Sequence, residues 1–211
     1  MKTLLMAFGS SLLLLWGQSA KAQLVSFGLK GGIPANAAFS NVSQGNATAS
    51  DYTRRYTVGP TVELHLPLHF SLEVDALYRR NGFSYSTYQI FFYPAPPTYE
   101  TTAQFNFRSA LNDWQVPILA KYEMVPGPAR PFVDGGLVYR SISGTSSTNV
   151  RADHTNVVGI ALGGGISFKL AHLRIEPEIR YIHWPTPPYS GTTSEFASAK
   201  NQADILLGIT F

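Results

Sequence analysis

The sequence contains no cysteine and few charged residues. The absence of thiols excludes disulfide bonds and a cysteine-linked lipid anchor, and a metal site would need histidine or carboxylate ligands. Charged residues make up 14% of the 211 residues, against about 25% in an ordinary soluble domain. The formal net charge of +3 includes Lys2 and Lys21 near the start, so the rest of the chain is close to neutral. Nothing is basic enough to predict a nucleic-acid partner.

Long apolar runs are also scarce, and the clearest one lies at the start. It spans residues 4–16, follows Met1 and Lys2, and precedes an Ala20-Lys21-Ala22 cleavage pattern. This order predicts a secretory signal peptide over residues 1–22 and a mature domain over residues 23–211. No later run reaches the roughly 18 apolar residues that a membrane-spanning helix needs. Membrane insertion would therefore have to use strands.

Apolar and polar side chains alternate over the last nine positions. The apolar set is Ala203, Ile205, Leu207, Ile209 and Phe211, and the polar set is Asp204, Gly208 and Thr210. Because successive side chains of a strand point to opposite faces, this stretch predicts a strand with one apolar face. Leu206 is the exception on the polar side.

The same alternation predicts seven further strands. They lie at about residues 24–33, 56–66, 70–79, 114–123, 130–142, 154–169 and 173–181. The connections between the eight strands alternate in length, beginning with a long one at residues 34–55 and a tight turn at residues 67–69. Four long connections thus fall at one end of the strands, and the tight turns and both termini at the other.

This layout, together with the closing aromatic Phe211, resembles small bacterial outer-membrane barrels of the OmpA and OmpX type. The resemblance implies an all-β fold, an eight-stranded antiparallel up-and-down transmembrane barrel with a protruding second extracellular hairpin. It implies a bacterial outer-membrane location with both termini periplasmic, and a monomer in contact with outer-membrane lipid and lipopolysaccharide. It also implies that Phe211 is the assembly signal read by the barrel-assembly machinery.

Alternation alone fits a soluble lipocalin-like barrel as well, with the inner and outer faces exchanged. Two features favour the membrane. The polar face is rich in Gly, Ala, Ser and Thr, which suits a narrow interior. Aromatic residues gather near both strand ends on the apolar face, as in the girdles of membrane barrels. They are Phe70, Tyr122, Phe168 and Phe211 at the turn side, and Tyr78, Trp114, Tyr139 and Tyr181 at the loop side.

Hairpin geometry predicts which charged side chains meet on the polar face. If Leu66 faces Phe70, Glu63 lies opposite Glu73. If Tyr78 faces Trp114, Lys121 lies diagonal to Glu73, and Lys30 follows on the first strand. Two neighbouring carboxylates resemble a glycosidase or protease dyad. The interpretation favoured here is an ion-pair network that closes the lumen, because no nucleophile accompanies them.

The same geometry at the last hairpin, with Phe211 facing Leu173, places Arg180 opposite Asp204. We expect a structural ion pair there.

Enzymatic and metal motifs fail. Lipid A deacylases with this architecture use a His-x-Ser element near the end of the chain, and here His183 is followed by Trp184 and Pro185. The five histidines show no metal-ligand spacing. The sequence thus predicts a non-enzymatic barrel without cofactor or metal, with a lipid A-modifying enzyme or a narrow pore as alternatives.

The second long connection differs from the others because residues 83–88 and 102–107 keep a strand-like alternation. If the pairing of Tyr78 with Trp114 continues upward, Tyr85 faces Phe107 and Thr87 faces Phe105. A bulge or bend at Asn81-Gly82 is the alternative. The segment 84–110 is then a hairpin that either extends the barrel or offers open edges to an extracellular protein partner. We expect roles in envelope integrity and in surface contact or adhesion.

Overall fold

The structure is a computed structural model that describes residues 24–37, 42–44, 47–51, 56–93, 99–143, 150–151, 156–170, 172–186, 190–191 and 199–211. The long strands are β1 (Val25–Pro34), β4 (Thr57–His65), β5 (Phe70–Asp75), β6 (Leu77–Tyr93), β7 (Tyr99–Glu123), β8 (Ala129–Ser143), β10 (Asn156–Leu170), β11 (Leu173–His183) and β13 (Asn201–Thr210). The short ones are β2 (Val42–Gln44), β3 (Ala47–Asp51), β9 (Val150–Arg151) and β12 (Ser190–Gly191). Within these ranges no helix is long and apolar enough to cross a membrane. The predicted signal peptide lies outside the described residues.

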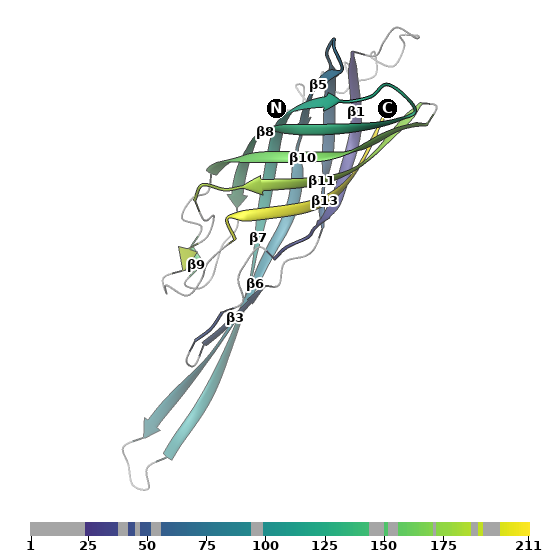
Figure 1. Cartoon of the computed structure of the whole chain (residues 1–211). Helices are drawn as coiled ribbons and strands as arrows, with labels where there is room; N and C mark the ends of the chain where they lie inside the picture. The colour runs from purple at the N-terminus through teal and green to yellow at the C-terminus, as the bar shows by residue number, and fades with distance from the viewer. Residues whose placement is uncertain are drawn as a thin grey trace, which may run out of the picture.

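The long strands close into an antiparallel barrel (Figure 1). Apart from β5 and β6, which both lie between β4 and β7, each long strand pairs with the next one in sequence, and β1 joins β13 on one side and β4 on the other. β5 and β6 are consecutive parts of one wall strand, interrupted at Ala76. The nine long strands therefore form an eight-stranded wall. The predicted fold class is therefore confirmed.

The break between β5 and β6 has a local cause. Ala76 faces Pro60 of β4, and Pro60 has no N–H to donate back across the ladder. The Ala76 N–H still donates to the Pro60 carbonyl oxygen over 3.0 Å. Next to it, a Cβ on Gly59 would lie 1.8 Å from the Ala76 carbonyl oxygen, so this close approach requires glycine. The register on the two sides of Ala76 is the same.

The two faces of the wall differ as predicted. Inward-facing positions are buried and mostly polar, whereas the large side chains that remain exposed are overwhelmingly apolar. Leu207, Ile209 and Ile205 of β13 are 47%, 41% and 49% exposed, while the intervening Leu206 is 2% exposed. A continuous exposed apolar surface of this extent marks a face that contacts lipid. The apolar face is thus the outer one.

The hairpin of β6 and β7 continues far beyond the barrel (Figure 1). Its pairing runs without a bulge from Leu77 opposite Gln115 to Tyr93 opposite Tyr99, straight through Asn81-Gly82. We call the part from Asn81 to Leu111 the ribbon. The predicted facing of Tyr85 with Phe107 and of Thr87 with Phe105 is confirmed.

The sequence predicts a loop for the first long connection, residues 34–55, and this prediction is wrong in part. It contains β2 and β3, which pair with each other, and β3 also pairs with β6 from Ala47 opposite Thr87 to Asp51 opposite Phe83. Part of the β6 edge is therefore covered by the chain itself. Two later connections also meet, because β9 pairs with β12.

The last residue closes the seam of the barrel. Although β13 ends at Thr210, the Phe211 N–H donates to the Phe27 carbonyl oxygen over 2.9 Å, and the Phe27 N–H donates back over 3.2 Å. Phe211 thus continues the ladder between β13 and β1, and its side chain stays exposed on the outer face.

Candidate functional site

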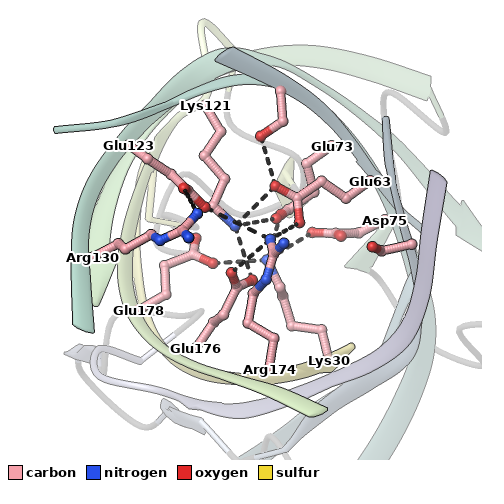
Figure 2. Close-up of polar contacts among 12 residues, drawn as sticks. Lys30, Glu63, Glu73, Asp75, Lys121, Glu123, Arg130, Arg174, Glu176 and Glu178 are labelled. Carbon is pink, nitrogen blue, oxygen red and sulfur yellow. Dashed lines mark hydrogen bonds and ion pairs between the residues drawn. The ribbon is translucent and has the colours of Figure 1, made fainter. Parts of the chain in front are cut away.

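A cluster of buried charges fills the lumen at the turn side. Glu63 of β4 and Glu73 of β5 face each other across the ladder, and both side chains are buried. The Ser71 hydroxyl donates to Glu63 over 2.6 Å. Two carboxylates this close need cations around them, because buried like charges are costly when unpaired. Figure 2 shows the side chains of this cluster pointing from the wall toward one another.

Two lysines lie on either side of Glu73. The Lys121 ammonium is 3.4 Å from Glu73, 3.5 Å from Glu63 and 2.8 Å from Glu176. It also lies 4.3 Å from the centre of the Phe132 ring, within the range of a cation–π contact. Lys30 contacts Glu73 directly and is 2.8 Å from Glu178. Lys30, Glu63, Glu73 and Lys121 thus lie in one connected group.

Arg180 extends this group across the lumen rather than along its own ladder. Its guanidinium lies 2.6 Å from Glu178, 2.8 Å from Asp75 and 3.0 Å from Glu73. Asp204 is opposite Arg180 in the register, as predicted. However, the expected Arg180–Asp204 ion pair is wrong, because Arg180 takes these three other partners.

Asp204 belongs instead to a second polar group nearer the loops. Its carboxylate accepts from Arg79 over 2.5 Å and from the Gln202 amide over 2.6 Å. In the same region, Arg140 donates to Asp113 over 2.5 Å and stacks 4.5 Å from the centre of the Trp184 ring. None of these contacts was predicted.

Apolar side chains share the lumen with the two charged groups. The buried cluster consists of Leu119, Val138, Val157, Ala161, Ile182 and Trp184. A Cβ on Gly159 would lie 2.7 Å from the Trp184 ring, so glycine makes room for the indole. The interior is thus packed with side chains from all sides of the wall, as expected of an eight-stranded barrel.

The predicted girdle residues lie on the outer face. At the turn side, the Phe70 and Tyr122 rings are 4.9 Å apart between centroids, and at the loop side Tyr78 and Trp114 are 5.2 Å apart. Phe168 at the turn side, and Tyr139 and Tyr181 at the loop side, are also exposed. Aromatic side chains at both ends of an apolar band are suited to the two membrane–water interfaces.

The loop-side tyrosines share a contact that sequence reasoning missed. Each donates its hydroxyl to the side-chain oxygen of an asparagine on the neighbouring strand, over 2.8 Å in all three cases. The pairs are Tyr78 with Asn112, Tyr139 with Asn156, and Tyr181 with Asn201. In each pair the asparagine faces the residue two positions after the tyrosine, namely Arg80, Ser141 and His183. We call this arrangement the rim motif; its signal in the sequence is a Tyr-x-polar triplet paired with an asparagine.

Two structural relatives support the fold. Neisserial surface protein A is similar with a TM-score of 0.52 and 11% identity, covering 90% of this chain and 98% of that one. The outer membrane protein OprG from Pseudomonas aeruginosa is similar with a TM-score of 0.53 and 11% identity, covering 89% and 94%. A sequence search of curated proteins found no match. Residues 16–183 match the family described as the outer membrane protein beta-barrel domain. The chain therefore belongs to the outer membrane protein beta-barrel family.

Proposed function

We infer that this outer-membrane barrel is non-enzymatic, supports envelope integrity and makes surface contact through its ribbon. In this proposal the four long connections face outward and both termini face the periplasm. The observation that carries it is the ribbon, which continues the barrel wall far beyond the girdle of Tyr78 and Trp114 (Figure 1). A barrel that only had to span the membrane would not need this extension.

The filled lumen supports a scaffold rather than a pore. Lys30, Lys121 and Arg180 reach the centre from three different strands and are each at most 1% exposed in their side chains. Charged side chains that bind one another in this way leave ions few free ligands along the axis. The exposed ribbon is therefore the better candidate for function.

One edge of the ribbon is suited to bind another strand. Among the described residues, the pairing of β7 with β8 begins with Asn112 opposite Ser143 and runs toward the turn side, and β6 occupies the other edge of β7. Two backbone bonds at the turn end of β7 show which way its amides point. The odd-numbered Glu123 N–H donates to the His69 carbonyl oxygen on the β5 side, whereas the even-numbered Met124 N–H donates to the Pro131 carbonyl oxygen on the β8 side. Since the register is constant, the N–H and C=O groups of even-numbered residues 100–106 point to the edge that has no partner strand in the described part of the chain. An extended segment of an extracellular protein can add there by backbone hydrogen bonds.

Adherence of bacteria that display the protein on a surface coated with serum proteins tests this proposal. Replacing residues 88–104 by Asn-Gly keeps Thr87 opposite Phe105 and keeps the pairing with β3, and we expect it to abolish adherence. Gln104→Pro removes one edge N–H without breaking the ladder to β6 and should weaken adherence. Gln104→Ala removes only the side chain and serves as the matched control. Unchanged adherence of the shortened protein, at equal surface levels, would refute the proposal.

The expected partners follow from this placement. Lipid and lipopolysaccharide of the outer membrane would cover the apolar face, and the barrel-assembly machinery would bind the strand that ends at Phe211. The exposed faces of the wall are apolar and suited to lipid rather than to a second barrel, so we propose a monomer. No nucleic acid or cofactor is part of the proposal.

A further inference from the structure

Charges are sorted between the inside and the outside of the barrel. Among the carboxylates whose side chains the structure describes, all but the half-buried Asp51 are buried. They are Glu63, Glu73, Asp75, Asp113, Glu123, Asp134, Glu176, Glu178 and Asp204. The exposed charged side chains in the same ranges are all basic, namely Arg80, Arg108, Lys169 and Lys200. The described outer surface therefore attracts anions.

Arg80 stands out among these cations because of its position on the wall. It is on the outer face of β6, two residues beyond Tyr78 in the direction of the ribbon. Two residues advance a strand by about 7 Å. Aromatic girdles lie at the level of the lipid headgroups. The guanidinium of Arg80 is thus at the height of headgroup phosphates, with the Tyr78–Trp114 ring pair beneath it.

A second donor lies beside Arg80. Asn112 of β7 is directly opposite Arg80. Even-numbered residues of β7 form the non-hydrogen-bonded pairs with β6, in which facing side chains are closest. The Asn112 oxygen accepts from the Tyr78 hydroxyl over 2.8 Å. This contact holds the amide so that its NH₂ group remains available, and the NH₂ group has no partner in the described part of the chain.

The guanidinium of Arg80 is equally uncommitted. It forms no hydrogen bond or ion pair with the residues that the structure describes, in contrast to the buried arginines Arg79 and Arg180. A planar guanidinium next to an amide NH₂ group matches the oxygens of a phosphate. Ser141 and His183 occupy the position of Arg80 in the other two copies of the rim motif. The pair of β6 and β7 is therefore the cationic copy.

We propose that Arg80 and Asn112 bind a phosphate group of a lipid in the outer leaflet. The apolar wall below the site identifies the ligand as a lipid, since Val58 and Ile118 are 48% and 49% exposed on the same face and would contact its acyl chains. The Trp114 and Tyr78 rings separate the two regions, with the phosphate above them and the chains below. The assignment to the outer leaflet rests on the proposed orientation of the barrel.

Native mass spectrometry of the full chain folded in detergent tests this site with bisphosphorylated lipid A as the probe. Losing one charge-assisted phosphate contact should weaken binding about tenfold in Arg80→Gln. Asn112→Asp keeps the oxygen that accepts from Tyr78 but replaces the NH₂ donor by a carboxylate, and we expect a loss of similar size or larger. Lys169→Gln makes the same charge change at the opposite end of the barrel and should bind like the wild type.

Two further arms identify the ligand group. Lipid A from which the phosphates have been removed should bind wild type and Arg80→Gln equally, and millimolar inorganic phosphate should not displace bound lipid A. Unchanged lipid A binding by both Arg80→Gln and Asn112→Asp would overturn the proposal. The proposal would also be overturned if the wild type bound dephosphorylated lipid A as tightly as bisphosphorylated lipid A. Because binding in detergent needs neither adherence nor a particular orientation, failure of the ribbon function leaves this result interpretable.

Discussion

Replacing Lys121 by methionine tests whether the buried charges hold the barrel together. Lys121→Met keeps most of the aliphatic stem and removes an ammonium that is 2.8 Å from Glu176, 3.4 Å from Glu73 and 3.5 Å from Glu63. All three carboxylates are buried. The change therefore leaves negative charge in the lumen with one cation fewer, and we expect the folded state to lose stability.

The magnitude follows from the partners that remain. Removing one member of a buried ion pair typically costs about 3–5 kcal/mol. Glu73 keeps Lys30 and Arg180 at contact distance, and Glu176 keeps Arg174 at 3.5 Å. This remaining compensation places the expected loss near the lower end, at about 3 kcal/mol. With a urea dependence of about 1–3 kcal/mol per molar, the unfolding midpoint should fall by roughly 1–3 M.

Reversible urea unfolding in lipid vesicles, followed by tryptophan fluorescence, measures the change. Lys169→Met removes an exposed lysine and should leave the midpoint in place. Adding Glu176→Gln to Lys121→Met should restore part of the loss, because it removes the carboxylate nearest to the missing ammonium. A midpoint for Lys121→Met equal to that of the wild type, in a correctly folded barrel, would refute the stabilising role of the network.

Three other measurements address the rest of the molecule. Deleting Phe211 removes both backbone bonds to Phe27 and should slow assembly in cells; normal surface levels would contradict an assembly signal. Hydrogen exchange should be slow at the odd-numbered amides of residues 103–109, which bond to β6, and fast at the intervening Gln104 and Asn106; uniformly fast exchange would contradict a stable ribbon. Planar-bilayer recordings should show no stable ion conductance, and steady channels would mean that the lumen opens.

The fold was predictable because each wall strand carries a two-residue alternation and ends at a recognisable turn. A strand with one apolar and one polar face fixes its own register, since a shift by one residue would exchange the faces. This constraint explains why the pairings of Glu63 with Glu73 and of Tyr78 with Trp114 follow from the sequence. It applies even to the ribbon, whose register continues that of the wall.

The short strands lacked that constraint. β3 has small side chains apart from Asp51, so it lacks the large apolar residues whose alternation marks the wall strands. Its pairing with β6 depends on the ribbon already being in place, because Ala47 and Asp51 find their backbone partners on residues above the barrel. A strand of this kind is specified by an available edge rather than by its own pattern.

The register between neighbouring strands does not predict which side chains contact each other inside the lumen. Arg180 and Asp204 face each other in the register. The neighbouring bond from the Trp184 N–H to the Lys200 carbonyl shows that even-numbered residues here form the hydrogen-bonded pairs, whose side chains are farther apart.

A barrel of eight strands is narrow, so a long arginine side chain reaches the opposite wall as easily as the neighbouring strand. Arg180 therefore binds Glu73 and Asp75 across the lumen, and Asp204 is left to Arg79. The alternation of side chains along each strand predicts which charged residues point inward. Only the closed barrel determines which of them form ion pairs.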